Sequence, residues 1–226
     1  LTRIARKRSL FGVIAAMAVV NLVYGITFPL LALVLDAQGV SKTLIGLSTI
    51  AQAAAIMFIA PWTPGLLRRV APSRVMQSVT VALAVLFILL GLFPNVWIWF
   101  PLRFVIGALT ALLWISSEAL INEMAEESWR GRIIGLYSSV GAAGFALGPL
   151  LLILTGSGGM LPFYTTSALI LAAGIPLFVV SHAQMGHGEE HHGGLWKVFW
   201  LAPTIMLANV VYAAAAESLL TFFPLF

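Results

Sequence analysis

Residues 9–34 read SLFGVIAAMAVVNLVYGITFPLLALV, an apolar run without a single charged side chain. A helix rises ~1.5 Å per residue, so this run is long enough to cross the ~30 Å hydrocarbon core of a bilayer. Of the 226 residues in the chain, 61% are apolar and only 9% are charged. A soluble domain carries about 25% charged residues. The deficit is too large for a water-exposed surface and predicts an all-α membrane protein.

Similar apolar runs divide the rest of the chain. Breaks rich in Gly, Pro or charge, at 36–39, 64–69, 94–95 and 156–159, separate them. The hydrophilic segment 182–195 then predicts a cytoplasmic linker between a six-helix bundle, 1–181, and the start of a second bundle at 196–226. We predict seven membrane-spanning helices, at about 9–34, 43–66, 74–94, 97–122, 131–155, 160–181 and 196–226.

The basic residues alternate between the two ends of these helices. Lys42 stands alone on one side, and Arg103 lies inside a span. By the positive-inside rule the other side, which includes the N-terminus, is cytoplasmic. Because the basic residues lie in short loops between apolar runs, the pI of about 9.9 does not indicate nucleic-acid binding. The basic side carries Arg3, Arg6, Lys7, Arg8, Arg68, Arg69, Arg74, Arg130, Arg132 and Lys197.

The fifth predicted span carries a glycine pattern: Gly135, Gly144 and the pair Gly148-Pro149. Glycines four residues apart permit close helix contact, and a proline frees a backbone carbonyl and allows a bend. The pattern resembles the antiporter motif in the fifth helix of the major facilitator superfamily, although residues 152–153 are not the usual glycine pair. The resemblance covers the whole chain, is strongest to bacterial drug and metabolite antiporters, and favours export by antiport. An ordinary helix-packing motif is the alternative.

Two further motifs bear on the same family. Arg103 and Gly107 resemble the Arg-x-x-x-Gly motif of its fourth helix, whose Arg is implicated in proton coupling in proton-coupled members. An arginine facing lipid costs at least ~2.5 kcal/mol, so Arg103 is expected in a polar cavity or against a partner, with snorkelling to outer headgroups as the alternative. Arg69 matches the basic position of the family's gating loop between helices two and three. Arg68 stands where the family motif has an acidic residue. The general basicity of cytoplasmic loops is therefore an equally good explanation for the presence of both arginines.

Polar and aromatic residues near mid-span are the candidates for a substrate cavity. Asn21, Tyr24 and Phe28 share one face of the first span, and Asn209 and Tyr212 share one face of the seventh. The two spans show a faint repeat, as parallel repeats do in transporters. Hydrogen bonding between helices is the alternative use of the two Asn residues.

Other candidates lie in the fourth and seventh spans. Trp114 and Glu118 follow Arg103 by eleven and fifteen residues, which places all three on one helical face. Trp114 is a further substrate candidate, and Glu118 is a candidate for proton coupling or simply marks the helix end. A carboxyl buried at Glu217 would have a raised pKa and exchange protons, unless it faces an outer vestibule.

The sequence lacks the signatures of other protein classes. It has no Cys, no serine-hydrolase, zinc-protease or P-loop motif, and a single Asp, so we predict neither an enzyme nor a cofactor. A histidine cluster lies in the Gly-rich linker, which offers no fixed geometry, so no metal site is predicted. The cluster consists of His182, His187, His191 and His192.

These features predict a secondary transporter in a bacterial cytoplasmic membrane. It would move a small organic solute by alternating access, coupled to protons. Because the family needs two bundles and the chain stops within the seventh span, we expect a fragment whose partner is the remaining C-terminal bundle. A non-transporting receptor or assembly subunit is the alternative.

Overall fold

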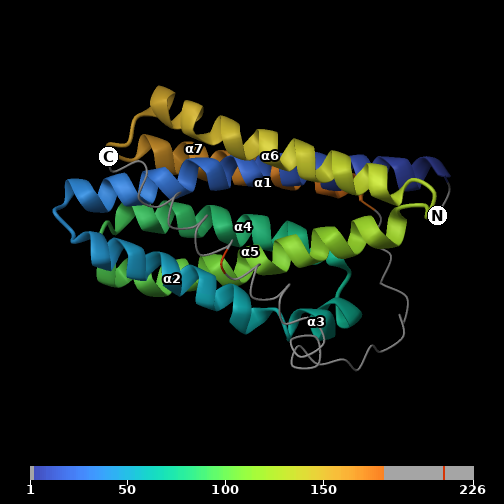
Figure 1. Ribbon diagram of the computed structural model, residues 1–226, viewed down its shortest axis with the longest axis horizontal. Helices are drawn as coiled ribbons and strands as arrows, with labels where there is room; N and C mark the ends of the chain where they lie inside the picture. The colour runs from blue at the N-terminus through green and yellow to red at the C-terminus, as the bar shows by residue number, and fades with distance from the viewer. Residues whose placement is uncertain (1–2, 181–210, 212–226) are drawn as a thin grey trace.

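The computed structural model of the protein describes residues 3–180 and residue 211. Helix follows helix throughout 3–180 (Figure 1). Six of these helices are long and apolar enough to cross a membrane, the last of them counted through Phe178. The elements are α1 (Arg3–Ala37), α2 (Lys42–Ile59), α3 (Thr63–Arg69), α4 (Pro72–Leu92), α5 (Val96–Met124), α6 (Arg130–Thr155), α7 (Leu161–Gly174) and the 3-10 helix η1 (Ile175–Val179).

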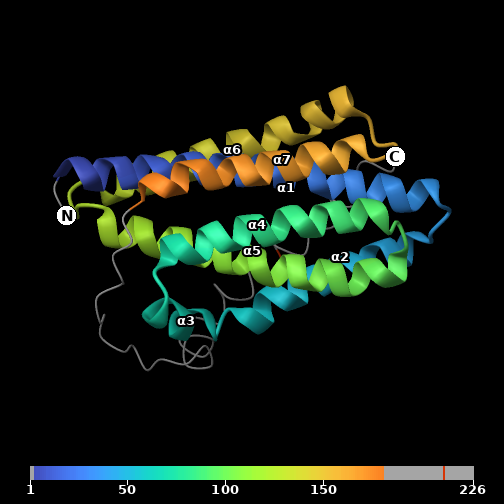
Figure 2. The ribbon, with the colours of Figure 1, turned by 180° about the vertical axis from the view of Figure 1, so that it is seen from behind.

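The long helices lie along one axis in two groups, and helices that follow one another in the chain alternate in direction (Figure 1). Helices α1, α6 and α7 lie on one side, and α2, α4 and α5 lie on the other (Figures 1 and 2). Helix α1 packs mainly against α6 and α7, α2 packs against α5, and α4 packs against both α5 and α7. The α4–α7 contact therefore joins the two groups.

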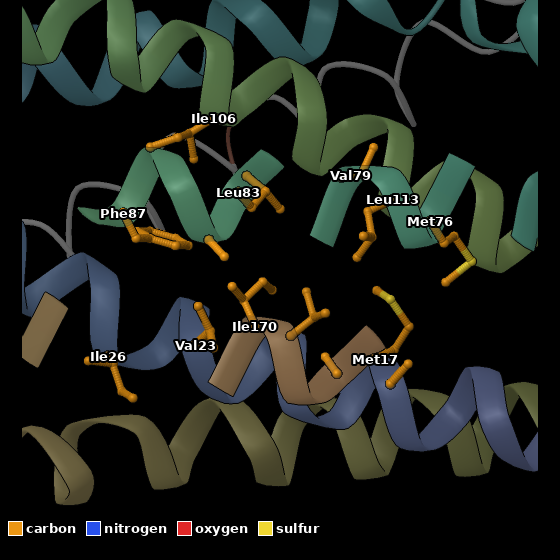
Figure 3. Packing of buried hydrophobic residues seen from close by; sticks show 14 of the residues in the cluster. Met17, Val23, Ile26, Met76, Val79, Leu83, Phe87, Ile106, Leu113 and Ile170 are labelled. Carbon is orange, nitrogen blue, oxygen red and sulfur yellow. The ribbon is translucent and has the colours of Figure 1, made fainter. Parts of the chain in front are cut away.

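The apolar core lies between the two groups (Figure 3). Met17 and Val23 of α1 approach it from one side, and Leu83 and Phe87 of α4 approach it from the other. All four side chains are at most 2% exposed.

Several buried hydroxyls donate to a carbonyl of their own helix, as Thr27 does to Val23 and Thr166 does to Pro162, which satisfies them where no water can. Thr110 Oγ1 and Ser116 Oγ have no partner among the described residues.

Most of the basic residues that the structure describes lie at one end of the bundle. Helix α1 begins, α5 ends and α6 begins at this end, and α3 lies there too (Figure 1). Arg6 joins two of these helices, since its Nε donates to the Met124 carbonyl and its Nη1 lies 3.7 Å from Glu126 Oε1. Lys42 pairs with Asp36 at 3.7 Å at the α1–α2 connection. The fold thus collects the predicted cytoplasmic charges, while their orientation in a membrane stays a prediction.

The prediction of a continuous second helix is wrong. Instead of one helix over 43–66, α2 ends at Ile59 and α3 begins at Thr63. Pro61 has no amide hydrogen for the preceding turn of helix, and its ring clashes with that turn, so α2 stops there. Pro64 occupies the first turn of α3, where a missing amide hydrogen does no harm.

The other predicted spans within the described residues agree with α1, α4, α5, α6 and α7 to within a few residues, except at the end of the sixth. There the α-helix ends at Gly174 and continues as η1, which contains Pro176. The linker 182–195 and the seventh span 196–226, apart from residue 211, lie outside the described residues.

The outer faces of α2 and α6 are apolar. Met57 and Phe58 on α2 are 79% and 63% exposed, and Ile153 and Leu154 on α6 are 76% and 80% exposed. Water would oppose such exposure, whereas lipid or another apolar helix accepts it. The fold is therefore that of an integral membrane protein that crosses the membrane several times.

Candidate functional site

A cavity of about 200 Å³ opens between α1, α2, α5 and α6. Its wall contains all the substrate candidates that the sequence analysis placed on α1 and α5, which are Asn21, Tyr24, Phe28 and Trp114. The structure therefore brings together residues that lie up to ninety-three positions apart in the chain. The remaining lining residues are Thr49, Gln52, Ala53, Ile56 and Phe145.

Aromatic rings form most of the apolar wall. The ring centroid of Tyr24 lies 5.2 Å from that of Trp114 and 5.6 Å from that of Phe28. Phe28 in turn lies 6.3 Å from Phe145 of α6. Rings at these separations attract one another in tilted and edge-on arrangements. Their exposed faces and edges offer surface to a flat or cationic organic ligand.

Two amides supply polar groups at the cavity. Gln52 Nε2 donates to Tyr24 Oη at 3.0 Å, and Asn21 Nδ2 donates to the Met17 carbonyl at 2.8 Å. Among the described residues, no donor reaches the side-chain oxygen of Asn21 or of Gln52. Each amide is thus oriented by the bond that it donates, and its oxygen is available to a ligand.

Glycines of α6 allow it to approach α1 closely, forming what we term the α1–α6 interface. A Cβ on Gly144 would overlap the Ala18 carbonyl oxygen, and a Cβ on Gly148 would overlap the backbone of Gly25. A Cβ on Gly141 would come 3.2 Å from Asn21 Nδ2. Only glycine fits where backbones meet in this way. Two members of the predicted motif, Gly144 and Gly148, therefore pack α6 onto the helix that carries Asn21.

Gly135 and Pro149 play different parts in that motif. Gly135 is exposed and has nothing within 4 Å of its Cβ position among the described residues, so its role in packing or gating stays a prediction. Pro149 cannot donate to the Phe145 carbonyl, as prolines lack the amide hydrogen. The freed oxygen is the nearest atom to the Cβ position of Gly25. The proline thus leaves an acceptor turned toward α1.

Arg103 is buried at the α2–α5 interface, our term for the contact between those helices. It is 2% exposed, and its Nη1 donates to Ser48 Oγ at 2.6 Å. Ser48 in turn donates to the Ile45 carbonyl at 2.7 Å. The side chain therefore does not snorkel to a headgroup, and the prediction of a polar partner is confirmed.

The glycine of the Arg103 motif lies one turn further along the same interface. A Cβ on Gly107 would overlap the Gln52 carbonyl oxygen. The spacing of four residues turns both members of the motif toward α2. Arg103 and Gly107 thus position the helix turn that carries Ser48 and Gln52.

The remaining predicted residues lie away from this cavity or outside the described residues. Glu118 is exposed and does not line the cavity, and Arg69 is exposed in the last turn of α3. Their roles in proton coupling and gating stay predictions. Asn209, Tyr212 and Glu217 lie outside the described residues.

The sequence analysis missed Gln52, Thr49 and Phe145 in the cavity wall. Gln52 had a usable signal, because it is an amide in the middle of an apolar helix, as Asn21 is. Thr49 lies one turn before it on the same helix face. Phe145 had no such signal, since a phenylalanine does not stand out from the other apolar residues of a membrane span.

No metal site is evident in the described part of the chain, where no three His, Asp or Glu residues come together. The four linker histidines, His182, His187, His191 and His192, lie outside that part. The expectation about them stays untested.

A bundle of membrane-length helices, four of which line an aromatic, amide-bearing cavity, defines a polytopic membrane protein. The chain belongs to the major facilitator superfamily, whose model matches residues 13–226. Members of this family are membrane transporters rather than enzymes. Recognition of the family from the motifs of α5 and α6 is thereby confirmed.

Two bacterial relatives carry the same family assignment. The chain is 28% identical over 161 residues to "Uncharacterized MFS-type transporter YfkF" of Bacillus subtilis (strain 168), covering 70% of this chain and 41% of the relative. It is 26% identical over 102 residues to "Uncharacterized MFS-type transporter YE1530" of Yersinia enterocolitica serotype O:8, covering 45% of this chain and 27% of the relative. The matched parts thus span less than half the length of either relative.

Proposed function

We propose that the protein is a secondary active transporter that binds a small organic solute between two helix bundles and moves it by alternating access. The observation that supports this most is the convergence of Asn21, Tyr24, Phe28 and Trp114 with Gln52 on one cavity. Binding sites of this kind combine apolar walls with a few placed polar groups.

The size of the cavity supports a site shared with a second bundle. Its volume of about 200 Å³ is below the about 300–1,000 Å³ typical of small-molecule sites. We propose that Asn209 and Tyr212 of the predicted seventh span supply part of the opposite wall. The apolar outer faces of α2 and α6 flank the cavity and are suited to contact that bundle.

The chemistry of the cavity favours aromatic or cationic organic solutes over inorganic ions. Faces of Tyr24 and Trp114 attract cations and flat rings. No carboxylate lines the cavity among the described residues, so a metal cation would lack its usual ligands there.

We further propose that transport is coupled to protons, that the solute is exported by antiport, and that the protein lies in the bacterial cytoplasmic membrane. Arg103 is one helix turn from Gly107, which contacts Gln52 of the cavity wall. A change of charge near a buried guanidinium alters its attraction to polar partners strongly, because the local dielectric is low. Glu118 and Glu217 are the proposed carboxylates that exchange protons.

The test uses the full-length protein in inverted membrane vesicles with an imposed pH gradient. Aromatic organic cations are added, and collapse of the gradient is followed by fluorescence. We expect collapse with wild type, at least about tenfold slower collapse with Trp114→Ala, and none with Arg103→Ala or Glu217→Gln. Trp62→Ala is the matched control, since Trp62 is exposed outside the cavity.

Two results would overturn parts of the proposal. If the solutes exchange across the membrane without moving protons, transport stands and proton coupling is wrong. If they bind to the folded protein without crossing, the protein acts as a receptor or an assembly subunit.

A further inference from the structure

A second cavity, of about 300 Å³, lies at the basic end of the bundle. It is bounded by the start of α1, the end of α5 and the segment that leads into α6 (Figure 1). It shares no lining residue with the cavity that contains Tyr24. The two cavities are therefore separate sites.

The wall of this second cavity has an apolar part and a charged part. Leu10, Met124 and Ile133 provide the apolar surface, and Arg6 and Lys7 provide positive charge. Such a division suits an amphiphile, with its hydrocarbon on the apolar wall and an anionic group beside the basic residues.

The charges within the cavity do not cancel. Arg6 is held by Glu126, at 3.7 Å, and by the Met124 carbonyl, so that pair is balanced internally. Lys7 is exposed and forms no salt bridge with any described residue. Among the lining residues, Arg6 and Lys7 thus outnumber the one carboxylate, that of Glu126, and Lys7 carries the excess positive charge.

The level of the cavity along the helices matches a membrane interface. The apolar run of α1 begins at residue 9, two positions after Lys7, and Trp129, a lining residue, directly precedes α6. Tryptophan and basic side chains concentrate where helices leave the hydrocarbon. Basic pockets between helices on the cytoplasmic side are suited to the headgroups of anionic lipids.

We propose that this cavity binds one anionic phospholipid of the cytoplasmic leaflet. Its phosphate lies beside Lys7, and an acyl chain lies along Leu10 and Ile133. The proposal uses the predicted cytoplasmic orientation of the N-terminus and does not depend on the solute or the coupling ion.

The test measures lipid binding to the full-length protein by native mass spectrometry. Phosphatidylglycerol and phosphatidylcholine are titrated separately into delipidated protein in detergent. We expect wild type to bind one phosphatidylglycerol well above the level of phosphatidylcholine. Lys7→Gln should weaken phosphatidylglycerol binding about fivefold, as expected for one basic residue at a membrane surface. Arg8→Gln, which removes the same charge from an exposed neighbour outside the cavity, should leave binding unchanged.

A second pair of variants tests the apolar wall. Leu10→Trp fills the space expected for the acyl chain and should weaken binding about tenfold, equivalent to about two excluded methylene groups. Phe11→Trp adds bulk at a side chain that is 75% exposed and should have no effect. Thermal unfolding of each variant confirms that it is folded.

Three results would overturn the proposal. One is equal binding of the two lipids by wild type. Another is equal loss of binding in a cavity variant and its control. The third is binding of inorganic phosphate that is weakened by Lys7→Gln and unchanged by Leu10→Trp. That result would indicate a site for a soluble anion.

Discussion

The two helix interfaces beside the cavity that contains Tyr24 differ in the groups that meet there. At the α1–α6 interface, Gly144 and Gly148 bring backbones into contact. At the α2–α5 interface, buried Arg103 donates to Ser48, and Gly107 permits approach to Gln52. Both interfaces thus require glycine where backbones meet, and the α2–α5 interface adds a buried charge. A backbone overlap cannot be relieved by rotating a side chain, so the α1–α6 interface, where two glycines meet backbone, should be the less tolerant of substitution.

The largest effect is expected from Gly148→Val. The new side chain would overlap the backbone of Gly25, so α6 must move away from α1. Overpacking of this kind costs about 3 kcal/mol. The variant should lose most of its folded material in detergent, as measured by thermal unfolding followed by size-exclusion chromatography. Gly135→Val is the control, and an equal loss there would mean that valine itself disfavours α6.

Arg103→Ala should have the second-largest effect on folding. It deletes a large buried side chain and its bond to Ser48, at an expected cost of about 2 kcal/mol. Arg74→Ala, at an exposed arginine, should change stability by less than about 0.5 kcal/mol. Combining Arg103→Ala with Ser48→Ala should show a coupling of about 1 kcal/mol in a double-mutant cycle. Strict additivity of the two would show that the hydrogen bond contributes nothing.

A smaller effect is expected at the bond between Gln52 and Tyr24. Tyr24→Phe removes the acceptor of Gln52 Nε2 and should cost about 1 kcal/mol, because the amide is left with one bond fewer in a buried site. Tyr24→Phe with Gln52→Leu removes both partners and should be closer to wild type than Tyr24→Phe alone. The comparison is made by thermal unfolding without solute. A double variant that is less stable than both single ones would contradict this account.

The smallest effect is expected from Gly135→Ala. No described atom lies within 4 Å of the Cβ position, and alanine favours a helix over glycine by about 0.5–1 kcal/mol. Folding stability should therefore be unchanged or slightly raised. If transport nevertheless falls in the vesicle assay while stability holds, Gly135 acts in gating, as the family motif implies.

The sequence placed Asn21, Tyr24 and Phe28 on one helix face, and all three line one cavity, although their role in binding stays a prediction. Asn21, Tyr24 and Phe28 were found together because they recur at helical spacing and because an amide in an apolar run needs a partner. Gln52 satisfied the same test but was overlooked. The break at Pro61 was missed, since the apolar run continues through it and hydropathy does not register a lost hydrogen bond.

The sequence by itself determined that this is a helical membrane protein. The low fraction of charged residues and the length of the apolar runs are set by the bilayer, and they do not depend on which helices pack together. Local motifs also determined the family. Only the tertiary structure decided which neighbour each motif serves: Gly148 meets Gly25, and Arg103 meets Ser48. Helical spacing fixes the face on which a residue lies, but the helix that covers that face is decided by packing of the whole bundle.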